Sequence, residues 1–140
     1  MNMSSTYYIG FADGASRQTQ NLASSAWELF SSTHSLLWED SIFLGPATNN
    51  QAEYAAIIGL LVDASSIGIR HIQVHLDSQL LVAQLNGFYS VHDPLLLCKY
   101  LCVRLLYQQF NTVNFVHVPR SVNAFVDSIA NNFLDWHILH

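Results

Sequence analysis

The sequence predicts an α/β protein in which five strands form one mixed sheet with helices packed against it. Segments with the two-residue alternation of strands and segments with helical spacing follow one another in the order βββαβααβα. The first three strands lie close together, as in an antiparallel meander, whereas the later strands are joined through helices and should be parallel to one another. The length of 140 residues fits one domain, covering residues 1–140 with an ordered core at about 5–137.

The expected meander occupies the first third of the chain. Residues 7–12 (YYIGFA) are the first expected strand, which should end at Asp13 and Gly14 because this pair is typical of a turn. After a polar loop, residues 23–32 and 35–45 have the composition of two further strands, and Gly45 with Pro46 closes the meander.

The remaining elements alternate between helices and strands. A helix is expected from about residue 50 to 66, ending near Gly68, and a strand over 70–77 with Asp77 at its carboxyl end. A short helix over 78–87 and a longer one over 92–110 follow, with Pro94 in the first turn of the longer helix. A fifth strand is expected over 111–119 and a last helix over 121–136. The apolar stripe of that last helix predicts five buried residues, namely Val122, Val126, Ile129, Phe133 and Trp136.

The two cysteines lie four residues apart in the 92–110 helix. Cys98 and Cys102 should therefore stack on one helix face, where we expect them to be small apolar core residues. No second pair of Cys or His residues supplies the further ligands that a zinc site needs.

The charge balance argues against nucleic acid as a partner when it is taken alone. The chain carries 10 acidic and 5 basic residues, a net charge of -5, whereas nucleic-acid-binding domains are usually basic. The net charge is weaker evidence against nucleic acid if several acids hold metal ions, because the charge of the ions must then be added to that of the chain. No apolar run approaches the roughly 20 residues of a membrane span, and MNMSSTYY lacks a signal-peptide pattern. We therefore expect a soluble, intracellular protein without a membrane partner.

Four acids fall at similar positions relative to the expected elements. Asp13 and Asp77 close strands, Glu53 lies in the first turn of the 50–66 helix, and Asp127 lies early in the last helix. Because sites in open α/β sheets gather at the carboxyl ends of strands, these four side chains should converge. Each taken singly has the simpler explanation of a solvated surface acid, and Glu53 that of a residue offsetting the helix dipole. Together they form a set of oxygen ligands suited to Mg²⁺.

Four motifs in order resemble those of type 1 ribonuclease H. They are DGAS with Asp13, TNNQAE with Glu53, HLDSQLLVAQLNG with Asp77, and HVPRSVNAFVDSIAN with Asp127. The resemblance covers nearly the whole chain and is greatest to the compact branch, found in archaeal-type enzymes, plant ribonuclease H-like domains and LTR retrotransposon polyproteins. It implies the ribonuclease H-like fold and an endonuclease that cuts the RNA strand of an RNA-DNA hybrid.

The resemblance also implies a catalytic mechanism with two Mg²⁺ ions, for which Mn²⁺ is a possible substitute. Asp13 would bridge both ions, Asp127 would help to hold the ion that activates water, and Glu53 with Asp77 would hold the other. All four carboxylates are therefore expected to be both catalytic residues and metal ligands.

Four further residues are expected to bind the substrate. Asn49 and Asn50 match residues that contact ribose 2′-hydroxyl groups, the groups that distinguish RNA from DNA, and Thr48 matches a phosphate contact. The alternative for these three residues is a role as helix cap. Arg120 stands where compact relatives carry an arginine, which implies a phosphate or product contact, and the alternative is an ordinary surface arginine.

The sequence departs from the family at the substrate-binding surface. RQTQNLASS replaces the usual turn after the first motif, and no lysine-rich protrusion precedes the 92–110 helix. A linked or associated reverse transcriptase or basic nucleic-acid-binding domain is therefore a possible partner. The alternative function is an interaction module with this fold and little or no activity. Another nuclease or integrase is a weaker alternative, because TNNQAE at a helix start is specific to ribonuclease H.

Overall fold

The computed structural model describes residues 6–140. Residue 5 of the expected core and the start of the segment examined for a signal peptide lie outside the described residues. The order βββαβααβα is confirmed. The elements are β1 (Tyr8–Arg17), β2 (Leu22–Phe30), β3 (Leu36–Gly45), α1 (Asn49–Ser66), β4 (His71–Leu76), α2 (Gln79–Leu85), α3 (Pro94–Tyr107), β5 (Thr112–His117) and α4 (Ala124–Leu139).

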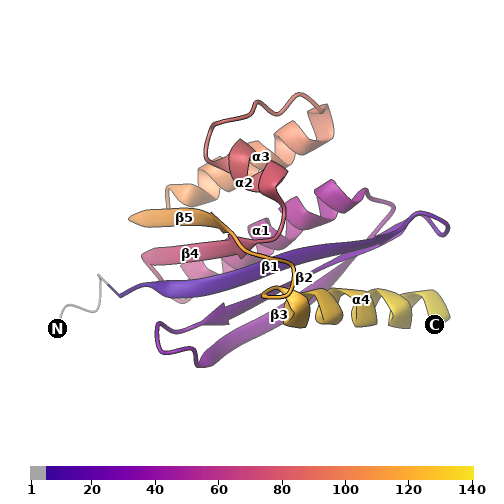
Figure 1. The fold of residues 1–140 in the computed structure, drawn as a ribbon, viewed down its shortest axis with the longest axis horizontal. Helices are drawn as coiled ribbons and strands as arrows, with labels where there is room; N and C mark the ends of the chain where they lie inside the picture. The colour runs from indigo at the N-terminus through magenta and orange to yellow at the C-terminus, as the bar shows by residue number, and fades with distance from the viewer. Residues whose placement is uncertain (1–5) are drawn as a thin grey trace.

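The strands form one mixed sheet in the order β3-β2-β1-β4-β5. β1 pairs with β2 and β2 with β3 in antiparallel orientation, whereas β1 pairs with β4 and β4 with β5 in parallel. The predicted meander and the predicted parallel strands are therefore both confirmed. Because β1 is central, it borders the antiparallel and the parallel half of the sheet (Figure 1).

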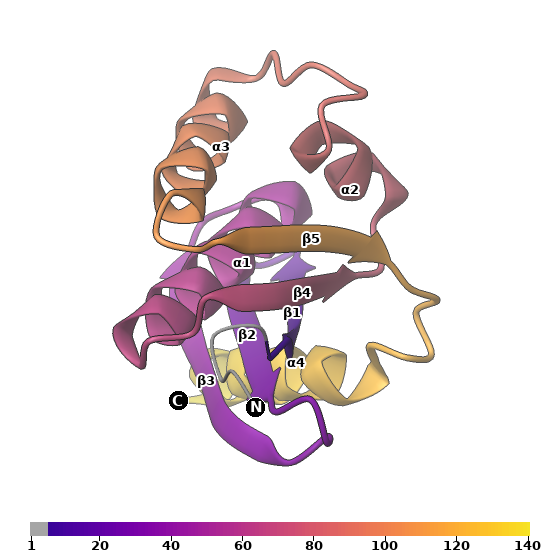
Figure 2. The same cartoon turned by 90° about the vertical axis from the view of Figure 1, so that its left-hand side faces the viewer.

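Helices cover both faces of the sheet, as two neighbouring serines of β2 show. The buried hydroxyl of Ser25 donates to the carbonyl of Ala52 in α1, and the hydroxyl of Ser24 donates to the carbonyl of Ala130 in α4. Successive strand residues point to opposite faces, so α1 and α4 lie on opposite sides of the sheet. In Figure 2, α2 and α3 lie beyond β4 and β5, whereas α4 runs beneath the antiparallel half.

The larger core lies between the sheet and α1. Ile57, Leu60 and Leu61 of α1 are fully buried there against side chains of β1, β2 and β4. A smaller cluster joins α4 to the other face, and its members are small, which lets the helix lie close to the sheet: Ala15, Ala26, Val126, Ala130 and Leu134.

The predicted end of the first strand is wrong. β1 continues through Asp13 and Gly14 to Arg17, and Asp13 pairs with Ala26 of β2 in the middle of the ladder. The two residues resemble a turn, but hydrogen bonding to β2 carries the strand past them. The reversal falls later, where Asn21 has a φ of 53°.

The predicted buried face of the last helix is only partly correct. α4 begins at Ala124, and Val122 and Trp136 are exposed by 51% and 55%. Val126 is buried as predicted, but the fully buried positions continue through Ala130 and Leu134. The helix turns the face with Val126, Ala130 and Leu134 to the sheet, which leaves Ile129 and Phe133 only partly buried at the edge of the contact.

The prediction for the cysteines is also wrong, because Cys98 and Cys102 are both exposed. α3 packs on α1 through a narrow stripe in which only Val103 is buried, with Tyr100 and Leu96 partly buried beside it. The cysteines lie on the outer side of this helix. Within residues 6–140, no helix is long and apolar enough to cross a membrane.

Candidate active site

Three carboxylates meet beside the middle of β1, where β4 ends and α1 begins. Asp13 projects from the middle of β1, Glu53 is the fifth residue of α1, and Asp77 directly follows β4. Each offers an oxygen that lies within 4.8 Å of the other two. The sequence predicted Glu53 in the first turn of α1, and this prediction is wrong, because α1 has no acidic residue in its first turn and Glu53 lies beyond it.

Strand pairing and one glycine bring these side chains together. The parallel register that pairs Phe11 with His75 brings Asp13 beside Asp77, two residues further along each strand. Gly14 lets α1 approach β1, since a Cβ at this position would lie 2.6 Å from the Ala52 carbonyl carbon and from the Glu53 backbone nitrogen. Glu53 is held against Asp13 because the backbone of β1 has no side chain at that point.

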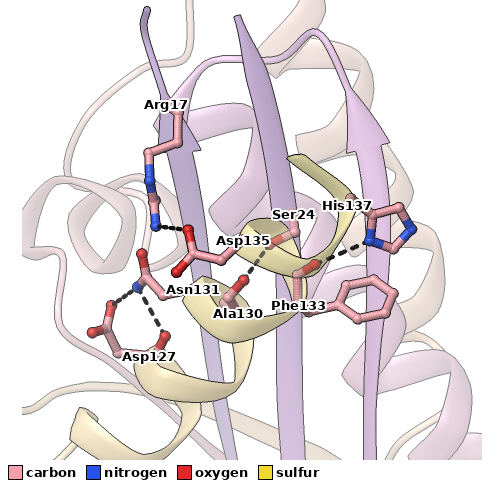
Figure 3. A network of polar contacts seen from close by, with 8 residues as sticks. All are labelled: Arg17, Ser24, Asp127, Ala130, Asn131, Phe133, Asp135 and His137. Atoms are coloured by element: carbon pink, nitrogen blue, oxygen red, sulfur yellow. Dashed lines mark hydrogen bonds and ion pairs between the residues drawn. The ribbon is translucent and has the colours of Figure 1, made fainter. Parts of the chain in front are cut away.

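The fourth acid, Asp127, lines the same cleft from the first turn of α4. It is not one of the three residues within 4.8 Å, but it lies close enough to accept a hydrogen bond from a protonated Asp13 carboxyl. The side-chain amide of Asn131 donates to the Asp127 carboxylate at 3.2 Å and to its backbone carbonyl at 2.9 Å (Figure 3). Arg17, which also lines the cleft, pairs with Asp135 at 2.9 Å in the same view.

Burial and mutual repulsion dominate the electrostatics of the cleft. Asp13 is only 4% exposed, and burial, the hydrogen bond to Asp127 and the charges of Asp77, Asp127 and Glu53 raise its pKa from 3.8 to about 9. A carboxyl with such a pKa is protonated at neutral pH unless a cation compensates its charge.

Glu53 shows the same effect to a smaller degree. Burial and the charge of Asp77 raise its pKa from 4.5 to about 7. Two neighbours oppose that rise: Asn49 donates its side-chain amide to Glu53 at 3.2 Å, and the charge of Arg120 favours the carboxylate.

The expected substrate-binding residues separate into two groups. Asn49 and Arg120 line the cleft with the acids, whereas Thr48 and Asn50 do not. Thr48 is the cap of α1: its hydroxyl accepts from the backbone of Gln51, whose side chain in turn accepts from the backbone of Thr48. The expected alternative role as helix cap thus falls to Thr48, and not to Asn49 or Asn50.

Sequence reasoning did not identify Asn131 and Arg17 as cleft residues. Asn131 follows Asp127 by four positions on one helix face, so its spacing was a usable signal. Arg17 had no such signal, because it was expected in a loop and lies at the end of the extended β1.

The cleft encloses about 200 Å³ and is lined mainly by polar groups. Its acidic donors are all carboxylate oxygens, the ligands that hard cations such as Mg²⁺ or Ca²⁺ prefer. Burial and the mutual repulsion of the acids raise the pKa values of Asp13 and Glu53, and Arg120 alone does not offset these effects. The donor set and the charge both fit divalent cations.

The comparisons with known proteins agree on one family. A family model described as reverse transcriptase-like matches residues 11–133. Ribonuclease HI of Halobacterium salinarum is 39% identical over 125 residues, which cover 89% of this chain and 63% of that protein.

Solved structures extend the likeness to the fold. The N-terminal RNase H domain of Rv2228c from Mycobacterium tuberculosis superposes with a TM-score of 0.89 at 36% identity, covering 94% of this chain and 95% of that chain. LC11-RNase H1, solved in complex with an RNA/DNA hybrid, superposes with a TM-score of 0.88 at 30% identity, covering 94% and 99%.

Several relatives are longer than this chain. It spans about two thirds of the Halobacterium protein, and 34% of the mycobacterial protein, which is described as bifunctional.

Proposed function

This chain belongs to the type 1 ribonuclease H family, and we propose from this premise that it is an endonuclease that hydrolyses the RNA strand of RNA-DNA hybrids. One observation carries the proposal: Asp13, Glu53, Asp77 and Asp127, from four separate elements, line one polar cleft. The names of the relatives support the substrate, since ribonuclease HI matches most of this chain and LC11-RNase H1 was solved with a hybrid.

The four acids are proposed as the ligands of two Mg²⁺ ions, with Mn²⁺ as a substitute. Asp13 is near Asp127 as well as near Glu53 and Asp77, so it is the residue that would contribute to the binding of both ions. When bound, two such ions activate a water and stabilise the charge that develops on the phosphate.

The neighbouring side chains hold these acids in position. Asn131 restrains Asp127 through its two hydrogen bonds, and Asn49 restrains Glu53 through one. The amide of Asn49 is a donor, so it also favours the ionised form of Glu53. The carboxylates are thereby kept ready to bind cations without a large rearrangement.

Substrate contacts are proposed for the residues at the rim. Asn49 can donate to a ribose 2′-hydroxyl with its remaining amide hydrogen, and Arg120 can bind a phosphate beside the acids. We also propose that Asn50 and Thr48 contact the substrate outside the cleft. Capping occupies the hydroxyl oxygen of Thr48 as an acceptor and leaves its hydrogen free to donate to a phosphate.

The isolated chain is expected to bind the RNA-DNA hybrid weakly. Its five basic residues allow few phosphate contacts, and Arg17 is engaged with Asp135. We therefore propose that a linked or associated reverse transcriptase or other basic nucleic-acid-binding domain provides further affinity. That some relatives extend well beyond the matched region supports this idea.

The test is cleavage of an end-labelled RNA-DNA hybrid, with duplex DNA and duplex RNA of the same sequence as controls. We expect only the RNA strand of the hybrid to be cut, with Mg²⁺ or Mn²⁺ present, and cleavage to stop on chelation. Binding of the hybrid without cleavage under any of these conditions would support the alternative of an interaction module. Cleavage of duplex DNA at a similar rate would point to another nuclease of this fold.

A further inference from the structure

A larger, apolar pocket of about 380 Å³ opens on the sheet face that carries α4. Glu28 and Phe30 point to this face, because they follow Ser24 and Ala26 in alternation along β2. α4 does not extend over this end of the sheet. The wall consists of six apolar side chains: Phe11, Phe30, Leu36, Val122, Phe125 and Val126.

Two glutamates share this pocket with the apolar wall. Glu28 of β2 and Glu39 of β3 lie directly opposite each other in the antiparallel ladder, and both line the pocket. Glu28 is only 4% exposed, and its side chain has no hydrogen-bond or ion-pair partner among residues 6–140. Burial and the charge of Glu39 raise the pKa of Glu28. Glu39 is exposed, and because like charges at opposed positions destabilise a sheet, a cation bound at this pair would be favourable.

No lysine or arginine of residues 6–140 pairs with these two glutamates. β4 carries His71 and His75, and the His75 ring packs edge-on against Phe11 at 4.9 Å between centroids. Burial lowers its pKa, so the ring is neutral at pH 7. All five basic residues lie elsewhere: Arg17 at Asp135, Arg70 at the Gln109 carbonyl, Arg104 at the Leu85 carbonyl, Arg120 in the carboxylate cleft and Lys99 in a pocket beside Leu95.

We propose that this pocket is a docking site for an arginine side chain of a partner protein. The guanidinium would bind Glu28 and Glu39, and the methylene stem would lie against Phe11 and Phe30. Phenylalanine rings also suit a guanidinium, which they attract through their faces. The proposal is independent of the nuclease function.

The rim of the pocket favours a protein over a free small cation. Phe125, Leu36 and Val122 are exposed by 75%, 51% and 51%, and together they surround the entrance with apolar surface. A protein surface around the arginine would cover these side chains, whereas a small amine would leave them in water. A nucleic acid does not fit, because its phosphates would be repelled by the two carboxylates.

The first test compares two peptides that differ in charge alone. The acetylated and amidated tripeptide Leu-Arg-Leu and its analogue with citrulline, a neutral isostere of arginine, are titrated into the ¹⁵N-labelled chain. We expect saturable backbone shifts around Phe11, Val122 and Val126 with the arginine peptide, and binding weaker by about tenfold or more with citrulline, since a charge-assisted hydrogen bond is lost. Equal binding of the two peptides, or no saturable shift with either, would overturn the proposal.

The second test removes the acid. Glu28→Gln should weaken binding of the arginine peptide by about tenfold or more. Asp40→Asn is the matched control, since Asp40 neighbours Glu39 on β3, is exposed, and points to the opposite face of the sheet. This control makes the same change in net charge and should leave binding within about twofold, because an exposed charge on the opposite face of the sheet is screened by solvent and salt. Unchanged binding by Glu28→Gln would show that the pocket is not the docking site.

Discussion

The carboxylate cleft and the apolar pocket both hold buried acids, yet their surroundings differ. In the cleft, Asp13 is surrounded by three further acids and by the amides of Asn49 and Asn131. In the pocket, Glu28 has one acidic neighbour and phenyl rings around it. Polar walls with converging oxygens suit a small hard cation, whereas aromatic walls suit a cation with an apolar stem. The two sites therefore suit different cations because their lining residues differ, although both carry negative charge.

The largest expected effect is loss of catalysis on changing the cleft. Asp77→Asn should lower hybrid cleavage by on the order of 10³-fold, because removing one oxygen ligand weakens stabilisation worth several kcal/mol. The variant should still fold, since the substitution removes one of four carboxylate charges that repel one another in the cleft. Cleavage kinetics and circular dichroism check both points, with Asp40→Asn as the matched control. Activity near that of the parent chain would contradict the assignment of Asp77 as a metal ligand.

The second effect is on the pH dependence of stability without metal. The folded pKa of Asp13 is raised from 3.8 to about 9, so the folded chain keeps a proton that the unfolded chain releases between these values. The contribution of Asp13 to the free energy of unfolding should be fully present below about pH 3.8. It should decrease as pH rises from there, by at most about 1.4 kcal/mol per pH unit.

Asp13→Asn should remove most of this slope, and Mg²⁺ should flatten it in the parent chain. Urea unfolding across this pH range, with chelator or with Mg²⁺, measures both. Glu53 contributes in the same direction, since its pKa is also raised, so some slope should survive in the variant. Identical slopes in parent and variant would mean that the Asp13 carboxyl is not destabilised by its neighbours.

A third effect tests how the cleft is held together. Gly14→Ala should force α1 away from β1, because the added Cβ meets the backbone of Ala52 and Glu53. Overpacking of this kind costs about 1 to 3 kcal/mol, and cleavage should fall further than the loss of folded protein explains. Gly10→Ala is the control: its Cβ meets the flexible end of Leu60, so stability falls while activity per folded molecule is kept. Equal activity per folded molecule in the two variants would show that Gly14 does not position Glu53.

The smallest effect concerns the apolar pocket. Glu28→Gln should raise the free energy of unfolding by about 0.5 to 1 kcal/mol, because it removes a like-charge cross-strand pair. The gain should grow as pH rises, since burial and Glu39 raise the pKa of Glu28. Chemical unfolding of this variant and of Asp40→Asn checks the effect. A loss of stability would indicate a structural role for Glu28 that the docking proposal does not include.

Local patterns predicted the fold because strands and helices of this chain keep their periodicity. The order of elements and the parallel orientation of strands joined through a helix, such as β4 and β5, both followed from spacing along the sequence. The convergence of Asp13, Glu53 and Asp77 was predicted from strand ends at one edge of the sheet. That reason holds for Asp77, which follows β4, but Asp13 lies within β1 and reaches the site through its register with β4.

Pairing across the sheet could not be predicted in the same way. The continuation of β1 past Asp13 depends on β2, and the opposition of Glu28 and Glu39 depends on a register that local sequence does not encode. The outward position of Cys98 likewise depends on how narrowly α3 contacts α1. These features belong to tertiary packing, which overrides local preference.

The docking of α4 has a consequence for how the protein is made. Its contacts with the sheet join residues far apart in the chain: Ser24 to Ala130 over 106 positions and Ala12 to Asn123 over 111. A ribosome releases residues in order, so Asp13, Glu53 and Asp77 emerge long before Asp127, and closing such long loops is entropically costly. The growing chain therefore carries three of the four acids without the helix that completes the set. We expect nuclease activity to appear only after synthesis has passed α4, which keeps the unfinished protein from cutting nucleic acid.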